Sequence, residues 1–427
     1  MSVLRCIAVI FGMSLLAVVP PAGGSESAPA PKSLPARIEE TAGANRLRLD
    51  HAGGKFSGPA WDALVGAGAA ARFFLLGEEH GIAENPKLAA ELFGALAPKG
   101  YGRFVIEVSP PMARALDRAA GSGLEGLLAQ YAKPGGVPAF FGMKEEAEML
   151  VAVRSSVSEP DPVLWGVDYE VGGDRLLISE LEGMRKPDSA SAALAALRDA
   201  SDAAWAKYEE TRGPQYIFSF SGDPALVRSL REAWPRRSAV ATEILDALEE
   251  TLEINRLWVA ERGWESNARR AEYMRRNFAA HWTAGTKAGK GPRVFAKMGA
   301  SHMLRGRSMT EVYDLGSLIH ETAALHGDTV FHLLVLPGSG SRVAVFNPSA
   351  WRFEPGPPKD SYMEGLEPIT KAAFDDAFTL IDLRPLRPLL GHWRDDSDPN
   401  LMRVVHGFDA VLILSGSTPS TNLLGEP

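Results

Sequence analysis

Four short apolar segments, each followed at once by a side chain that can carry a proton, constrain the fold most strongly. They are ARFFLLGEEHG at 71–81, GRFVIEVSP at 102–110, PVLWGVDYE at 162–170 and RVFAKMGASHM at 293–303. Apolar runs this short are typical of buried β-strands. In open α/β sheets, ligands bind at the carboxyl ends of parallel strands, where the loops leave the sheet. Titratable groups far apart in the sequence can therefore meet in one pocket, which favours an enzyme.

The segments between these runs have helical signals. Asn85-Pro86 begins a helix with leucines at i, i+4 spacing, Pro110-Pro111 begins another, and 144–157 (KEEAEMLVAVRSSV) is helical. This β-α-β-α-β order predicts an α/β fold with a mostly parallel sheet flanked by helices. Further strands are expected in TVFHLLVL, RVAVF, FTLID and FDAVLIL toward the C-terminus.

Residues 186–290 have a different character, with apolar spacing near 3.6 and few strand signals. We expect a large helical insertion before the fourth strand, in which 238–281 forms one long helix weakened near Gly263. Five of the nine tryptophans lie in this region. They indicate either core packing between amphipathic helices or a lid over an apolar substrate.

Composition and charge narrow the class of protein. The chain has 427 residues, of which 45% are hydrophobic and 23% are charged, as in ordinary globular proteins. Its formal net charge of −8 and the absence of any Lys/Arg block argue against a nucleic-acid partner.

The N-terminus has the pattern of an export signal. Residues 1–24 combine Arg5, an apolar run and a stretch of small residues typical of a cleavage site. Residues 25–37 form a Pro/Ala/Ser linker. We therefore expect a single α/β domain over 38–427. The apolar run is short for a membrane span, which predicts a periplasmic or secreted protein without stable membrane insertion after cleavage. The only cysteine, Cys6, lies in the signal. The mature protein then has no disulfide and no cysteine nucleophile.

Glu78 and His80 form the sharpest local signal. Side chains alternate along an extended chain, so these two point the same way while Glu79 points opposite. A carboxylate and an imidazole on one face can orient each other for general-base chemistry or bind one metal together. The alternative is a solvated polar loop after a strand.

Three more strand ends carry candidate residues. Glu107 follows a buried strand, which indicates either a perturbed catalytic carboxyl or a structural salt bridge with Arg103 or Arg114. Asp168 has the same position on the next strand, where it contacts substrate or caps the following turn. His302 lies in a small-residue loop that a ligand can approach, or is a structural histidine.

Several common catalytic motifs are absent from the sequence, and their absence restricts the possible reaction mechanisms. It contains no G-x-S-x-G elbow, no Walker loop and no H-E-x-x-H pair. Without a serine or cysteine nucleophile motif, an activated water is favoured, with His80 as the base or a metal supplying the hydroxide. A divalent metal would be held by Glu78, His80, Glu107 or His302.

Several segments together resemble a known superfamily, which joins the erythromycin esterases, the ChaN-type haem-binding lipoproteins and the Tiki-type metalloproteases. The resemblance spans about 60 to 414 and is carried by LLGEEHG at 75–81, FVIEV at 104–108, RAEYMRRN at 270–277, AKMGASHM at 296–303 and FDAVLIL at 408–414.

The erythromycin esterases are similar in placing a Glu and a His after the first strand, a Glu after the second, and Arg-x-x-x-Met-x-x-Asn on a long helix. By this resemblance His80 is the general base, and the helix motif falls on Arg270, Met274 and Asn277. These three share one helical face, which would aim Arg270 and Asn277 at the strand ends.

The chain departs from the esterase pattern in two places. Only Glu79 stands between Glu78 and His80, and Gly299 with His302 replaces a histidine pair. Both departures resemble the ChaN and Tiki arrangement.

These observations predict an exported hydrolase that activates water against an ester or amide bond. Glu78 and His80 would activate the water, Glu107 and His302 would complete the pocket, Arg270 would stabilise negative charge, and Asp168 and Asn277 would contact substrate. The expected partner is a small-molecule or peptide substrate. The alternative is a ChaN-type protein that binds haem or another apolar ligand non-covalently, through His80 or His302.

Overall fold

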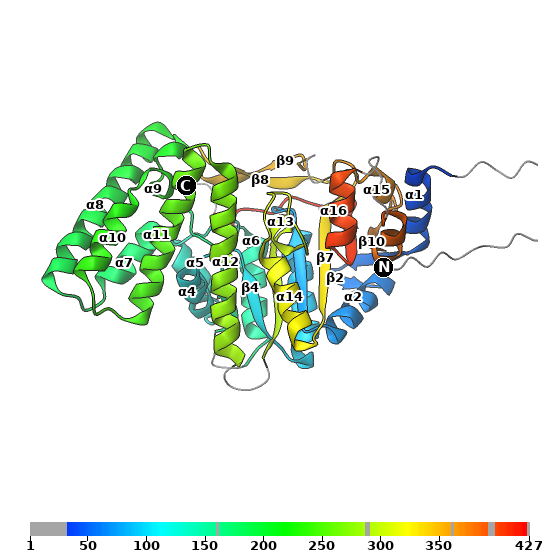
Figure 1. Ribbon diagram of the computed structural model, residues 1–427, viewed down its shortest axis with the longest axis horizontal. Coiled ribbons are helices and arrows are strands. Elements are labelled where there is room, and N and C mark those ends of the chain that lie inside the picture. The colour runs from blue at the N-terminus through cyan, green and yellow to red at the C-terminus, as the bar shows by residue number, and fades with distance from the viewer. Residues whose placement is uncertain (1–31, 159–161, 287–290, 360–362, 392–397, 425–427) are drawn as a thin grey trace, which may run out of the picture. The chain divides into compact units, whose positions relative to one another are not determined.

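The computed structural model describes residues 32–158, 162–286, 291–359, 363–391 and 398–424 (Figure 1). The predicted signal peptide, and residues 25–31 of the predicted linker, lie outside these ranges. No helix within them is both long and apolar enough to cross a membrane.

A nine-stranded sheet organises the fold, in the order β2-β1-β10-β11-β7-β3-β6-β4-β5. The strands from β11 to β5 pair in parallel, whereas β2, β1 and β10 form an antiparallel edge. The prediction of a mostly parallel α/β sheet is therefore confirmed. The strands are β1 Arg46–Ala52, β2 Lys55–Ser57, β3 Phe73–Glu78, β4 Tyr101–Ile106, β5 Leu164–Gly166, β6 Arg293–Gly299, β7 Val330–Pro337, β10 Phe378–Asp382 and β11 Ala410–Leu414.

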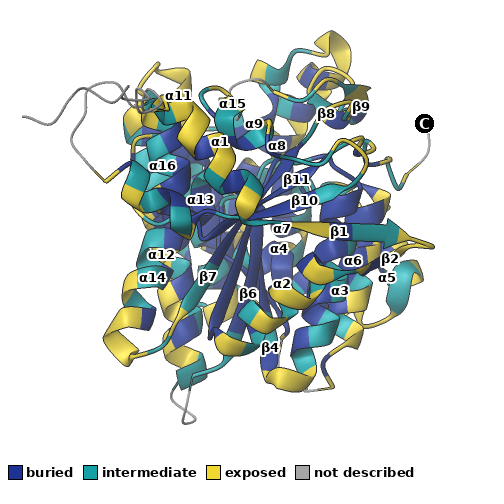
Figure 2. Ribbon diagram, turned by 90° about the vertical axis from the view of Figure 1, so that its right-hand side faces the viewer, coloured by how far each residue is buried: buried dark blue, intermediate teal, exposed yellow. Residues whose placement is uncertain are grey.

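Helices cover both faces of this sheet because its central strands are apolar on both sides. Along β3, Phe74 and Leu76 face one core while Phe73 and Leu75 face the other, as period-two alternation requires. Figure 2 shows the buried strands between helices whose exposed residues point outward. The first core packs under α2 Pro59–Ala70, α3 Glu84–Leu96, α4 Pro110–Ala120, α5 Gly123–Tyr131 and α6 Lys144–Ser155. The second packs under α1 Leu34–Ala44, α12 Gly263–Thr286, α14 Leu315–His326 and α16 Pro399–Gly407.

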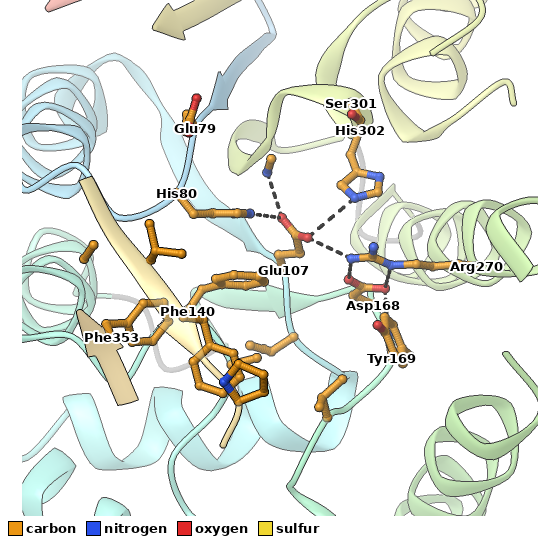
Figure 3. A pocket seen from close by; sticks show the side chains of 18 of the residues that line it. Glu79, His80, Glu107, Phe140, Asp168, Tyr169, Arg270, Ser301, His302 and Phe353 are labelled. Atoms are coloured by element: carbon orange, nitrogen blue, oxygen red, sulfur yellow. Dashed lines mark hydrogen bonds and ion pairs between the residues drawn. The ribbon is translucent and has the colours of Figure 1, made fainter. Parts of the chain in front are cut away.

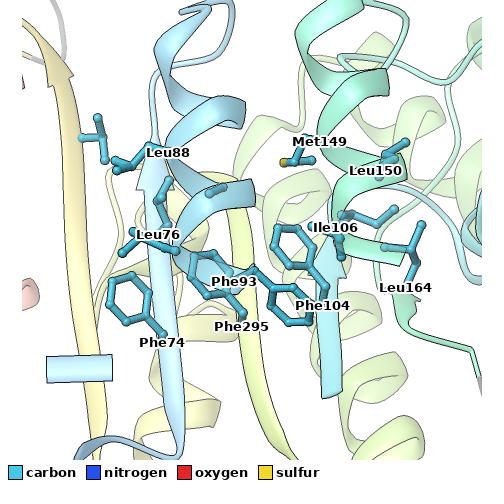
Figure 4. Packing of buried hydrophobic residues seen from close by; sticks show 14 of the residues in the cluster. Phe74, Leu76, Leu88, Phe93, Phe104, Ile106, Met149, Leu150, Leu164 and Phe295 are labelled. Atoms are coloured by element: carbon cyan, nitrogen blue, oxygen red, sulfur yellow. The ribbon is translucent and has the colours of Figure 1, made fainter. Parts of the chain in front are cut away.

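Aromatic rings hold the first core together (Figure 4). Phe295 on β6 stacks between Phe74 of β3 and Phe104 of β4, with ring centroids 4.9 and 5.1 Å apart. Phe93 of α3 meets Phe104 edge-on at 5.3 Å. These contacts fix the spacing of the three strands whose ends carry the candidate residues.

The region between β5 and β6 is helical, and it differs from the expected single long helix. Helix α11 spans Ala239–Val259 and α12 begins at Gly263; between them Glu261 has a φ of 58°, which ends the first helix. The other helices are α7 Asp174–Glu182, α8 Asp188–Thr211, α9 Phe218–Ser221 and α10 Pro224–Ala233. Together with α11 they enclose a core of their own, which contains Trp205 and Trp234. Trp258 and Trp264 are instead exposed.

Two parts of the sheet structure were not predicted. The edge strands β1 and β2 precede the first predicted strand, and RVAVF belongs to a separate hairpin rather than to the main sheet. This hairpin pairs β8 Val343–Asn347 with β9 Arg352–Gly356. It is held at the carboxyl ends of the parallel strands, where the Ala344 amide donates to the carbonyl of Gly81 at 2.8 Å.

Candidate active site

A cavity of about 510 Å³ lies at the carboxyl ends of β3, β4, β5 and β6, beside the β8–β9 hairpin. Polar side chains reach the cavity from the segments that follow these strands and from α12. They are Glu79 and His80 after β3, Glu107 after β4, Asp168, Tyr169 and Glu170 after β5, Ser301 and His302 after β6, and Arg270 from α12. His302 belongs to the short helix α13, Ala300–Met303, rather than to the predicted loop. Figure 3 shows His80, Asp168, Arg270 and His302 gathered around Glu107. The predicted convergence of distant segments thus occurs, in a volume suited to a small molecule.

Glu107 is the centre of this cluster. Its Oε1 accepts from Arg270 Nη2 at 2.8 Å and its Oε2 from the Gly299 amide at 2.7 Å. His80 Nε2 lies 3.4 Å from Oε2, and His302 Nε2 lies 3.5 Å from Oε1. Burial alone would raise the pKa of Glu107, but the two imidazoles outweigh it and hold this pKa well below its usual range. Glu107 is therefore a carboxylate at any working pH.

His80 is clamped between two carboxylates. Its Nδ1 lies 2.9 Å from Glu78 Oε1, and its Nε2 faces Glu107. Burial lowers the pKa of His80, but the carboxylates of Glu107 and Glu78 outweigh burial and raise it to about 9. At neutral pH the imidazole is thus mostly protonated, and Nε2 is the nitrogen that faces the cavity.

Glu78 is held from behind by a lysine that the sequence analysis did not single out. Lys297 Nζ lies 2.7 Å from Glu78 Oε1 and 2.7 Å from Glu146 Oε1, with all three side chains buried. Burial raises the pKa of Glu78, but Lys297 and His80 outweigh it and lower that pKa. For Glu146, burial prevails over Lys297 and raises the pKa to about 7.

His302 has a carboxylate of its own. Its Nδ1 lies 2.8 Å from Asp314 Oδ2, at the N-cap of α14. Burial and Arg270 lower the pKa of His302, whereas Asp314 and Glu107 raise it, and the result is a pKa of about 10. His302 is thus a second imidazolium at neutral pH, held on the opposite oxygen of Glu107 from His80.

Arg270 completes the cluster from α12. Its Nε donates to Asp168 Oδ1 at 3.0 Å, and its Nη2 bonds both Asp168 and Glu107. Its guanidinium lies 4.8 Å over the Tyr169 ring. Among the described residues its Nη1 has no hydrogen-bond partner, which leaves the two N–H donors of this nitrogen for a bound group.

A glycine permits the close packing of these groups. A Cβ on Gly299 would lie 3.1 Å from His80 Nε2 and 3.4 Å from Glu107 Oε2. A side chain here would crowd His80 Nε2 and require it to shift by a few tenths of an ångström, so the glycine that follows the fourth predicted strand serves the site directly.

Phe140 packs against the other side of His80. Its ring stacks on the imidazole with centroids 4.0 Å apart and planes at 13°. Its φ of 62° lies in the left-handed region, which costs a non-glycine residue about 1–3 kcal/mol. The surrounding packing maintains this strain, and the strained residue lies at the cavity.

The structure separates the predicted site residues into two groups. His80, Glu107, Asp168, Arg270 and His302 line the cavity. Glu78 is 1% exposed and lies behind His80, so it reaches the cavity only through the imidazole. Asn277 does not line the cavity either: its Nδ2 donates to the Val167 carbonyl at 2.9 Å and anchors α12 to the end of β5. Asn277 therefore lies away from the cavity, contrary to the expectation that it contacts substrate.

The structure also differs from the alternative interpretations of Glu107, Glu78 and His80. Glu107 is salt-bridged, but to Arg270 rather than to Arg103 or Arg114, because Arg114 pairs with Glu180 and Glu243. Neither Glu78 nor His80 belongs to a solvated loop.

The predicted divalent metal does not fit these residues. No three His, Cys, Asp or Glu side chains in the described ranges converge to hold a metal ion, and the Arg270 guanidinium lies where a cation would contact Glu107.

No protein-family model matches the chain, and no curated protein is significantly similar to it in sequence. Among solved structures, a Bacillus cereus protein has 16% identity and a TM-score of 0.57, covering 92% of this chain and 100% of its own. A succinoglycan biosynthesis protein has 14% identity and a TM-score of 0.56, with the same coverage. A mutant of the erythromycin esterase EreC in its open conformation has 16% identity and a TM-score of 0.55, covering 86% of this chain and 95% of its own. The fold is erythromycin esterase-like. This erythromycin esterase-like fold was predicted from the sequence, and the likeness concerns the fold alone.

Proposed function

We propose that the protein is a hydrolase that cleaves an ester or amide bond in a small molecule, with His80 as the general base. The supporting observation is the cluster of His80, Glu107, His302 and Arg270 around one cavity at the strand ends of this fold. Imidazoles held by carboxylates beside an arginine provide the groups that acyl transfer to water needs.

The proton transfers follow from the orientation of each group. Neutral His80 keeps its proton on Nδ1, because Glu78 accepts it there, and so presents the Nε2 lone pair to a water in the cavity. Nε2 takes a proton from this water while the water oxygen bonds to the substrate carbonyl carbon. Arg270 Nη1 donates to the oxyanion that forms.

His302 serves the second half of the reaction. As an imidazolium held by Asp314, it donates its Nε2 proton to the leaving oxygen or nitrogen as the carbon–heteroatom bond breaks. The products are a carboxylic acid and an alcohol or amine. The proton that His80 took from water and the one that His302 gave balance. The reactive form, with neutral His80 and protonated His302, is restored when one proton passes between them or through solvent.

Replacing His80 by asparagine tests the proposal. We expect kcat/KM on a panel of p-nitrophenyl esters and anilides to fall about 10²–10⁴-fold, because general-base catalysis contributes this much. His326→Asn, at an exposed histidine outside the cavity, is the matched control and should retain wild-type activity. The proposal is wrong if wild type hydrolyses nothing in the panel between pH 7 and 10, or if His80→Asn retains more than about a tenth of its activity.

Export is part of the proposal, because the chain starts with a signal-like segment. Mass determination of the protein recovered from the periplasm or medium should show loss of residues 1–24. Haem binding by the same fold would instead give a Soret band on haemin addition that alanine at His80 or His302 abolishes.

A further inference from the structure

One wall of the cavity is aromatic. Phe140 contributes from the loop between α5 and α6, and Phe346 and Phe353 contribute from the β8–β9 hairpin. The Phe140 and Phe353 ring centroids are 6.3 Å apart, and those of Phe346 and Phe353 are 5.2 Å apart. Figure 3 shows Phe140 and Phe353 on the His80 side of Glu107, whereas Asp168 and Arg270 lie on its other side. The side with Asp168 and Arg270 is thus charged, whereas the His80 side adds an aromatic surface, with Glu79 and Lys359 at its margin.

The hairpin that carries this wall is tied to the loop that carries His80. The Ala344 amide donates to the Gly81 carbonyl, and the Lys359 amide donates to Glu79 Oε1 at 2.9 Å. A Cβ on Gly81 would lie 2.1 Å from the Ala344 carbonyl oxygen, so the two segments are in direct contact. The aromatic wall therefore has a fixed position relative to the imidazole, and a group bound on it lies next to the reacting bond.

We propose that this wall binds the acyl part of the substrate, and that the substrate is an ester or amide of a hydrophobic carboxylic acid. This inference rests on the proposed function and names its substrate class. The leaving group must lie near its proton donor, His302, on the Oε1 side of Glu107. The acyl group then extends from the carbonyl carbon along the opposite, His80 side, where Phe140 stacks.

A series of esters with acyl chains of increasing length measures how much the aromatic wall contributes to substrate binding. With p-nitrophenol as a constant leaving group, kcat/KM should rise about fourfold for each methylene added between acetate and hexanoate, because the wall removes that methylene from water. Acetate esters of alcohols of increasing length should show no such rise. A flat acyl series, or an equal rise in the alcohol series, would overturn the assignment.

Substitutions in the aromatic wall should change how steeply kcat/KM rises with the length of the acyl chain. Phe353→Ala removes a ring and should flatten the acyl series, and Ala139→Phe, at a cavity-lining position beside Phe140, should lower the hexanoate-to-acetate ratio at least about tenfold by filling the space. Phe331→Leu, in the core on β7, is the control and should leave the slope unchanged. Because Phe353 is buried, Ala139→Phe keeps the test valid if Phe353→Ala unfolds.

Binding of hexanamide and acetamide, measured by calorimetry on the full protein, separates this inference from the proposed function. Hexanamide should bind at least about tenfold more tightly, and Phe353→Ala should remove the difference. Hydrolysis without chain-length preference would overturn the acyl subsite and leave the hydrolase intact. Tight hexanamide binding without any hydrolysis would overturn the hydrolase and retain an apolar ligand site.

Discussion

The charge on Glu107 sets the protonation of His80, and Glu107→Gln removes this charge with little change in shape. In the wild type, the pKa of His80 is raised from 6.5 to about 9. A shift of about 2.5 units corresponds to roughly 3.4 kcal/mol in favour of the imidazolium. Glu107 and Glu78 both supply it, against the opposing effect of burial.

The magnitude for the variant follows from these contributions. Glu107 Oε2 lies 3.4 Å from His80 Nε2, and Glu107 exerts the largest of the effects that raise this pKa. Without it, burial opposes Glu78 alone, so we expect the pKa of His80 to fall by about two units, to near 7 or below. The neutral fraction of His80 at pH 7 would then rise from about 1% to about half.

The assay is a titration of the His80 imidazole by NMR, with the signal assigned by comparison with His80→Asn. Far-ultraviolet circular dichroism at each pH verifies that Glu107→Gln remains folded. A His80 pKa that stays near 9 in the variant would refute the reasoning, because Glu78 alone would then maintain the imidazolium.

Two further predictions concern stability. Lys297→Met leaves Glu78 and Glu146 buried without their shared cation, so the free energy of unfolding in urea at pH 7 should fall by about 3–5 kcal/mol. The double variant Lys297→Met with Glu146→Gln should recover part of this loss. A loss below about 1 kcal/mol in Lys297→Met would contradict the role of Lys297. His80 and His302 have pKa values of about 9 and about 10 in the folded state, above 6.5, so the stability that they contribute is fully present below pH 6.5 and is lost as the pH rises to about 10. Urea unfolding should show a decrease of roughly 3 kcal/mol or more over this interval, and a flat or rising profile would be incompatible with two stabilised imidazoliums.

The sequence predicted the strand ends well because a parallel sheet leaves little freedom there. Strands β3, β4, β5 and β6 are parallel and end at the same edge of the sheet, so the residues that follow them reach the shared cavity. This is how the structure brings together His80, Glu107, Asp168 and His302. Arg270 came instead from resemblance, since a helical arginine on a charged face has no local signal that separates it from a solvated one.

The supporting residues were missed for different reasons. Lys297 had a visible signal, a charged residue inside an otherwise apolar central strand, and such a residue must be paired. Asp314 had none beyond its place before a helix. The aromatic wall was not predictable, because the alternation in RVAVF indicates a strand but not the sheet to which it belongs. Asn277 shares a helical face with Arg270, yet it lies about two helical turns further along α12, where it contacts the Val167 carbonyl instead of the cavity.

The pKa of about 9 for His80 has two opposite consequences for a general base. At pH 7 only about 1% of the free enzyme has a neutral His80, which lowers kcat/KM about a hundredfold. The same carboxylates stabilise the imidazolium that forms when His80 takes a proton from water, so they strengthen the base in the transition state. If His80 is the base and His302 the acid, kcat/KM should therefore rise about tenfold per pH unit between pH 7 and 8, level off near pH 9 and fall above pH 10, where His302 loses its proton. A rate profile that is flat from pH 7 to 9 would mean that the proton leaves water by another route, with Glu107 as the remaining acceptor in the cluster.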